Sequence, residues 1–304
     1  TIELAKSSSI GVDRTGVTIL AGGAVWQGGE ATPPLERLET AAASAIAPGG
    51  KLVATCQQSG LLEVTDVATR RVLWSTDISD REGAASAFNF RRLRFSPTGS
   101  KLALSTPGLD LVFEATRGGV LAELPNVSDD GQELSTDVLF IRGETRYVSS
   151  RRTRLILWDD TGLKRTVETG ARPYLSPAPD DRRVVVGTAT TVGFFGETDV
   201  GDIEWMRRGQ QSDSQIIAVA ASKTGLIAVG SLLGRVFVYD QTGQLVATRV
   251  AREIRRLHFE GERLIGDSRT TTFLWSLTPE AREPAQVADR IEELAGSGVS
   301  SDVR

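Results

Sequence analysis

The stretch from Lys51 to Trp74 constrains the fold more than any other part of the chain; it reads K-L-V-A-T-C-Q-Q-S-G-L-L-E-V-T-D-V-A-T-R-R-V-L-W. A Pro48-Gly49-Gly50 turn leads into an apolar strand over 52–56, and further short strands are expected over 61–64 and 71–74. The polar turns between these runs leave almost no room for a helix. The pattern therefore predicts an antiparallel meander of short strands.

The same unit recurs along the whole chain at a spacing near that of a four-stranded repeat. An aromatic or equivalent residue marks the end of the third strand in each copy, and in each copy a turn and a short apolar run come before it. These anchors are Trp26, Thr65, Phe113, Trp158, Phe195, Tyr239 and Trp275, separated by 39, 48, 45, 37, 44 and 36 residues. Four-stranded units that pack radially around an axis leave only short, protected edges. The sequence therefore predicts an all-β fold, a seven-bladed β-propeller over residues 1–277.

Four phrases carry a resemblance to a known family. They are F-S-P-T-G-S-K-L-A at 95–103, L-I-L-W-D at 155–159, V-F-V-Y-D at 236–240 and T-F-L-W-S at 272–276, and they resemble WD40 repeats. The Gly-His pair that opens typical repeats is missing, and His258 is the only histidine. The Asp-His-Ser/Thr-Trp hydrogen-bond network of typical members is therefore not expected. The blades are expected to be held by apolar packing and backbone hydrogen bonds, in a divergent style that resembles bacterial members.

The resemblance also implies how the ring closes, because the N-terminal strand of WD40 proteins commonly completes the last blade. Residues 1–8 are the candidate ring-closing segment, in which Ile2 to Ala5 alternates apolar and polar residues; the C-terminal segment is the alternative. The chain begins without an initiator Met and without the apolar h-region of a signal peptide, so we expect a fragment of a longer protein or a processed product.

Residues 278–304 are expected to form a separate C-terminal extension. Val287, Ile291 and Leu294 fall on one helical face after Pro284, and Gly296 is a natural stop. This pattern predicts a short helix at about 284–295. The helix either packs on the rim of the propeller or docks another subunit.

Charge and composition exclude several classes of function. The net charge is −4 and the pI near 5.3, which argues against nucleic acid or an anionic membrane as the main partner. No apolar run approaches the length of a membrane helix. Cys56 is the only cysteine, so no intramolecular disulfide can form, and a reducing, cytoplasmic location is expected.

Catalytic and metal-binding patterns are weak throughout. One cysteine and one histidine cannot supply the ligands of a Cys/His zinc site, and any Ser-His-Asp triad would need His258 as its base. Paired carboxylates remain open because the chain has 39 acidic residues, although no sialidase-like box is present. We expect no catalytic residue, no metal and no cofactor, and hence no enzyme.

Charged residues in the connections between blades are the candidate partner-binding residues. The two longest connections, about 77–84 and 126–133, are acidic, and long loops on a rigid scaffold usually carry recognition. Later blades contribute basic residues to the same face, which would make it acidic over blades 2–3 and basic over blades 4–7. The candidates are Asp77, Asp80, Glu82, Asp129, Asp130, Glu133, Arg151, Arg152, Arg172, Arg207, Arg208, Arg252 and Arg269. The alternative, that these are solvated loop charges, stays open.

Six Arg-Arg pairs add a second charge pattern, at 70–71, 91–92, 151–152, 182–183, 207–208 and 255–256. They are explained either by the coding bias of a G+C-rich genome or by selection for bidentate contacts to carboxylates or phosphates.

These patterns favour a non-catalytic protein-interaction or sensor propeller, expected to be a module of a larger bacterial signalling or defence protein or complex. Its partner would be a protein or an effector domain, in cis or in trans, and the resemblance implies that it holds an effector inactive until a ligand arrives. A quinoprotein-like envelope propeller, scaffold or enzyme, is one alternative, because the phrases at 66–74 and 240–246 resemble its strand-turn units. A propeller hydrolase is the other.

Overall fold

The computed structural model describes residues 9–13, 16–21, 24–27, 30–31, 41–79, 81, 92–106, 109–125, 135–196, 202–206, 214–251, 254–261, 263–268 and 272–277. Within these residues the chain forms 27 strands and no helix, so the all-β prediction is confirmed. This part of the chain accordingly holds no helix of the length and apolar character that crossing a membrane requires.

The described strands form seven antiparallel sheets, six with four strands and one with three. The first three sheets are β1 (Ser9–Asp13), β2 (Gly16–Ala21), β3 (Ala24–Gln27), β4 (Glu30–Ala31); β5 (Ala41–Ile46), β6 (Leu52–Gln57), β7 (Leu61–Asp66), β8 (Val72–Asp77); and β9 (Arg92–Phe95), β10 (Lys101–Ser105), β11 (Leu109–Glu114), β12 (Val120–Pro125).

The next two sheets are β13 (Ser135–Ile141), β14 (Arg146–Arg151), β15 (Arg154–Asp159), β16 (Gly162–Glu168); and β17 (Tyr174–Pro177), β18 (Arg183–Thr188), β19 (Thr191–Gly196), β20 (Glu204–Trp205). The last two are β21 (Ile216–Ala221), β22 (Ile227–Ser231), β23 (Arg235–Tyr239), β24 (Leu245–Val250); and β25 (Arg256–Glu260), β26 (Arg263–Asp267), β27 (Thr272–Ser276).

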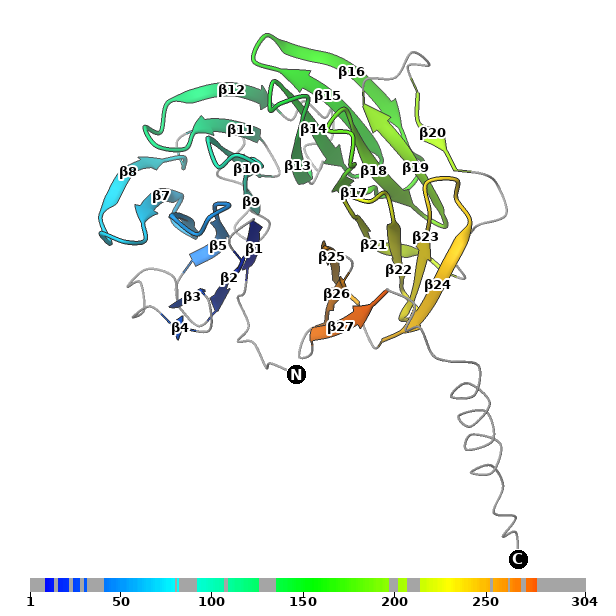
Figure 1. The fold of residues 1–304 in the computed structure, drawn as a ribbon. Coiled ribbons are helices and arrows are strands. Elements are labelled where there is room, and N and C mark those ends of the chain that lie inside the picture. Colours follow the sequence, from blue (N-terminus) through cyan, green and yellow to red (C-terminus); the bar gives the residue numbers. More distant parts are fainter. Residues whose placement is uncertain are drawn as a thin grey trace, which may run out of the picture.

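The sheets are arranged around an axis, with the first strand of each sheet innermost (Figure 1). These inner strands contact one another in succession, from β1 through β5, β9, β13, β17 and β21 to β25. The register supports the repeat read from the sequence, because six of the seven anchors pair with the first or second residue of their second strand, as in Leu102↔Phe113, Tyr147↔Trp158 and Val184↔Phe195. Trp26 is the exception, since it pairs with Ile19 in the middle of β2. The predicted ring-closing segment 1–8 and the predicted helix at 284–295 lie outside the described residues, as does the C-terminal segment that would close the ring instead.

Among the described side chains, five apolar clusters fill the spaces between neighbouring sheets from the second to the seventh, and each draws its residues from two sheets. Alternate residues of one strand enter different clusters, because side chains on a strand point to opposite faces. On β15, Leu155 and Leu157 pack toward the fifth sheet, whereas Ile156 and Trp158 pack toward the third. The middle strands are therefore covered on both faces, and the sequence shows apolar runs there in place of polar–apolar alternation.

Close stacking of the sheets requires small residues in the second strands. A Cβ added at Gly187 on β18 would lie 2.5 Å from Cγ1 of Val219, which belongs to the next sheet. The outermost strands β8, β16 and β24 instead alternate exposed and half-buried residues, because only one of their faces meets a neighbouring sheet.

Polar contacts also join the sheets, so the expectation that packing and backbone bonds hold them alone is wrong. Glu144, in the turn between β13 and β14, is buried against the turn between β9 and β10. Its carboxylate accepts hydrogen bonds from Thr98 N at 2.7 Å, Thr98 Oγ1 at 2.9 Å and Ser100 Oγ at 2.8 Å. Lys101 Nζ donates to the Glu144 carbonyl at 2.6 Å.

These donors reverse the effect that burial would have on the titration of Glu144. Burial raises the pKa of the carboxyl, but the hydrogen bonds from Thr98 and from Ser100 and Ser96 outweigh it and lower the pKa below its ordinary value of 4.5. A lowered pKa in the folded state means that the ionised carboxylate stabilises the fold. That contribution is present above pH 4.5 and is lost as the pH falls through the folded-state pKa.

We predict that Glu144→Gln lowers the free energy of unfolding by about 1–2 kcal/mol at pH 7, because the charge-assisted bonds are weakened. The deficit should shrink as the pH falls below 4.5, where the wild-type carboxyl is protonated as well. Urea unfolding at pH 7 and at acidic pH measures both. Glu114→Gln, which changes a partly exposed carboxylate on β11, is the matched control. A deficit that grows on acidification would contradict the assignment.

Candidate interaction face

The turns between second and third strands lie at the same edge of the ring as the connections from one sheet to the next. Ile78 N, just after β8, donates to Gly60 O in the β6–β7 turn at 3.1 Å. Leu232 N, in the β22–β23 turn, donates at 2.8 Å to Gln215 O, just before β21. We call this edge the connection face; its described turns are 58–60, 152–153, 189–190 and 232–234.

Four of the thirteen predicted partner-binding residues fall within the described chain. Asp77 is exposed at the end of β8, and its Oδ1 accepts from Ser79 N at 2.8 Å, which shapes the start of the connection. Arg152 is exposed in the β14–β15 turn. Arg172 is exposed, and its guanidinium lies 5.6 Å from the ring centroid of Tyr174.

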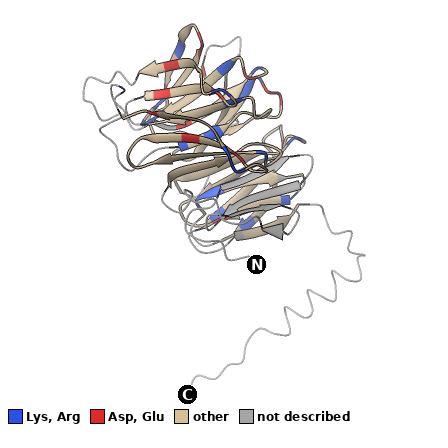
Figure 2. Ribbon diagram, turned by 90° about the vertical axis from the view of Figure 1, so that its left-hand side faces the viewer, with Lys and Arg blue, Asp and Glu red and all other residues tan. Residues whose placement is uncertain are grey.

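The other nine predicted residues lie outside the described chain, so the polarised face stays a prediction. They are Asp80, Glu82, Asp129, Asp130, Glu133, Arg207, Arg208, Arg252 and Arg269. On the described ribbons, acidic and basic residues are interspersed (Figure 2).

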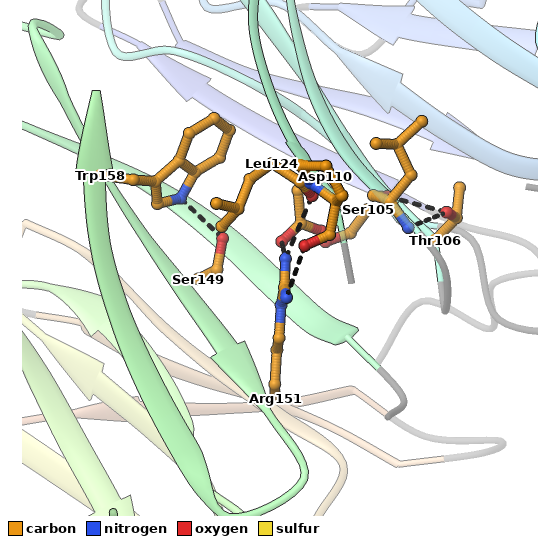
Figure 3. A network of polar contacts seen from close by, with 9 residues as sticks. Ser105, Thr106, Asp110, Leu124, Ser149, Arg151 and Trp158 are labelled. Atoms are coloured by element: carbon orange, nitrogen blue, oxygen red, sulfur yellow. Dashed lines mark hydrogen bonds and ion pairs between the residues drawn. The ribbon is translucent and has the colours of Figure 1, made fainter. Parts of the chain in front are cut away.

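Arg151 does not belong to the accessible surface, which corrects its assignment as a partner-binding residue. Its side chain is 3% exposed and forms an ion pair with the fully buried Asp110 of β11, with Nη2 3.1 Å from Oδ2. The same guanidinium donates at 3.2 Å to the carbonyls of Leu124 and Pro125 at the end of β12 (Figure 3). Asp110 also accepts from Ser105 Oγ at 2.7 Å.

This pair joins the third and fourth sheets close to the connection face, just where β12 leads into the acidic connection. A buried carboxylate keeps its charge only if a cation and further donors replace the water that it has lost. Arg151 and Ser105 supply those contacts. Arg151 therefore acts as a structural link that fixes where the connection after β12 begins.

The Asp-His-Ser/Thr-Trp network of typical WD40 repeats was not expected in this chain. One of its hydrogen bonds, from a tryptophan to a serine, nevertheless forms in the fourth sheet. Trp158 Nε1 on β15 donates to Ser149 Oγ on β14 at 2.8 Å, and both side chains are buried (Figure 3). The pairing does not need the missing histidine, because the serine hydroxyl alone satisfies the indole N–H.

Two residues that the sequence analysis did not single out stand out on the connection face. Leu232 and Leu233, at the tip of the β22–β23 turn, are 59% and 68% exposed. The backbone around them is held in place, since Leu233 N donates to Ser214 Oγ at 3.2 Å and Gly234 N donates to Ser231 O at 2.9 Å. Two consecutive leucines at a turn position were the signal that the sequence offered, because turns normally carry polar residues.

The structure describes the two residues that the sequence analysis considered for a zinc site or a catalytic triad. Among the described residues, no group of three or more His, Cys, Asp or Glu side chains could hold a metal ion. The Cys56 thiol is fully buried in β6, where no substrate in solvent can reach it. His258 lies in the middle of β25, opposite Ile265 on β26.

No family model matches the chain, and no curated protein matches it. Solved structures do match, among them the β-propeller domain of Cps50 (Swd1) from Myceliophteria thermophila, with a TM-score of 0.69 at 11% sequence identity. The alignment covers 91% of this chain and 100% of that domain. The fold is a WD40-like β-propeller. At 11% identity this similarity shows the fold alone and assigns no activity. In all, 1563 chains of solved structure match this chain.

We predict that Arg151→Met lowers the free energy of unfolding by about 3–5 kcal/mol, because it leaves the Asp110 carboxylate buried without its cation. Arg152→Met, which changes the neighbouring exposed arginine, should cost less than about 0.5 kcal/mol. The double variant Asp110→Leu with Arg151→Met should recover much of the loss, since neither charge is then stranded. Chemical denaturation measures all three, and equal stabilities of the two single arginine variants would refute the link.

Proposed function

We propose that this chain is a seven-bladed propeller without catalytic activity that binds a protein partner through its connection face. It would work as an interaction or sensor module of a larger bacterial signalling or defence protein or complex in the cytoplasm, with its effector in cis or in trans. Seven described sheets around one axis and the match over the whole of a known propeller domain support the architecture. WD40-like propellers commonly bind protein partners, which supports the type of function.

The exposed pair Leu232–Leu233 is the observation that carries the proposal. Fully burying a leucine side chain contributes about 1.5–3 kcal/mol, so a pair left in water on a rigid turn offers considerable binding energy to a partner. Because backbone hydrogen bonds already hold the turn, little conformational entropy is lost when it is covered. An exposed apolar pair of this kind is more suited to contact with a protein surface than to binding a small polar substrate.

Charged residues on the connection face would orient the partner. Arg152 lies exposed on the same face, and the nine charged connection residues that lie outside the described chain are proposed to add to it. Complementary charge contributes mainly to the rate and orientation of binding, whereas the apolar pair supplies affinity.

We predict that Leu232→Ser with Leu233→Ser removes capture of the partner and leaves the melting temperature within about 1–2 °C of wild type, because the side chains are largely exposed. The measurement is quantitative co-purification from the native host. It compares the proteins that co-purify with the wild-type chain and those that co-purify with the variant. Leu163→Ser is the matched control, since Leu163 is also 59% exposed but lies on the outer strand β16. If the pair of substitutions and the control retain the same proteins, the proposed face is wrong.

A further inference from the structure

A third exposed apolar residue lies beside the Leu232–Leu233 turn. Val250, the last residue of β24, is 75% exposed and pairs in register with the first residue of β23. The residue after it, Ala251, donates its backbone N–H at 2.7 Å to Gly234 O in the turn. Leu232, Leu233 and Val250 therefore lie at the same end of the sixth sheet, and we call these three residues the apolar corner.

Arginines border the apolar corner. Arg249 precedes Val250 on β24, and its guanidinium donates to the backbone carbonyls of Thr248 at 3.0 Å and Ser276 at 3.4 Å. Among the described residues, the acceptors of this cation are thus neutral carbonyl groups and not carboxylates. Arg255, in the connection that follows β24, is exposed. The corner is therefore apolar in its middle and basic at its border.

The end of the described chain lies close to the apolar corner. Ser276, the last residue of β27, accepts the hydrogen bond from Arg249, and the end of β27 lies beside β24 (Figure 1). Leu277, where the described chain ends, packs against the apolar cluster that the sixth and seventh sheets share. The C-terminal extension, residues 278–304, lies outside the described residues, and it begins within reach of one arginine side chain from β24.

The sequence of the extension complements the corner in polarity and in charge. Its predicted helix has Val287, Ile291 and Leu294 on one face, which supplies apolar surface. Residues 278–304 include six acidic and three basic residues, so the extension is net negative where the border of the corner is basic. Residues 278–286 can span up to about 30 Å when extended, so the apolar face can reach the corner from the end of β27.

We propose that the C-terminal extension docks in cis, with Val287, Ile291 and Leu294 lying on the apolar corner. The regulatory consequence rests on the proposed function: because Leu232 and Leu233 are also the proposed partner site, the docked extension competes with the partner. The chain then binds its partner with an affinity reduced by the fraction of molecules in which the extension is undocked.

Charge explains why the extension selects this end of β24. At the opposite end of the strand, Leu245 and Val246 are 49% and 52% exposed and form a comparable apolar pair. The turn beside them, however, carries the carboxylate of Asp240, which accepts hydrogen bonds from Thr242 and Gln244. A net negative segment is repelled by this carboxylate and attracted by the arginines at the corner.

Cross-linking of engineered cysteines in the full chain tests the docking without any partner. In the variant Leu233→Cys with Ile291→Cys, a short bismaleimide reagent should join the two positions within one chain. Leu245→Cys with Ile291→Cys is the matched control, because its first cysteine lies on the same sheet at the other end. The first variant should give about fivefold more of this product, since docking raises the effective concentration of the second thiol. The native Cys56 is fully buried and should not react.

Two further substitutions in the extension complete the test. Adding Val287→Ser and Leu294→Ser to the first cysteine variant should lower its yield to that of the control, because the apolar face is lost. Equal yields from the two cysteine pairs, or a yield that the serine substitutions leave unchanged, overturn the proposal. So does a product that links two chains and increases with protein concentration, since a second copy of the chain is then the occupant.

Co-purification separates this proposal from the proposed function. In the otherwise wild-type chain, Val287→Ser with Leu294→Ser should increase capture of the partner about threefold or more, because the site is no longer covered; unchanged capture refutes the competition. If Leu232→Ser with Leu233→Ser loses the partner but no cross-link forms, the proposed function stands and the docking is refuted. If the cross-link forms but these two substitutions do not alter capture, the docking stands and the partner site is wrong.

Discussion

Burial of the middle strands between two neighbouring sheets is the constraint on which the rest of the structure depends. No single sheet can cover both of its own faces, so each one is stable only with a neighbour on either side. β15 shows this directly, because Leu155 and Leu157 need the fifth sheet while Ile156 and Trp158 need the third. Close stacking in turn demands small residues, such as Gly187, where two sheets approach. A ring of sheets satisfies these demands with few exposed edges.

Polar groups are buried within this apolar framework wherever partners can replace the water they lose. The contact between the third and fourth sheets has such a group at each end: Glu144 with its donors in the β9–β10 turn, and Asp110 with Arg151 near the connection face. Between them lies an apolar cluster that includes Tyr147 and Trp158. Buried groups of this kind stabilise only the correct alignment of the sheets, since a shifted alignment would strand a charge. They thus compensate for the missing histidine network of typical WD40 repeats.

The connection face carries an exposed apolar pair at a turn, whereas the other exposed apolar pairs of the described chain, such as Val72–Leu73 and Leu245–Val246, lie on outermost strands. Leu232 and Leu233 offer this apolar surface on a fixed turn. The rigidity of the scaffold makes this arrangement possible, because a turn held by backbone hydrogen bonds can keep leucines in water.

The sequence by itself determined the repeat, the order of turns and strands, and the burial of the second strands, because turn chemistry and apolar runs are local properties of the chain. It did not reveal β5, whose A-A-A-S-A-I sequence has no apolar–polar alternation. In the structure this segment pairs with β6 and contacts the inner strands β1 and β9. Tertiary structure alone decided which charges are functional candidates. Arg151 and Arg152 are identical in type and adjacent, yet one is buried beside Asp110 and the other exposed. Asp110 and Leu124, which hold the guanidinium of Arg151, belong to the preceding sheet, and no local pattern encodes that proximity.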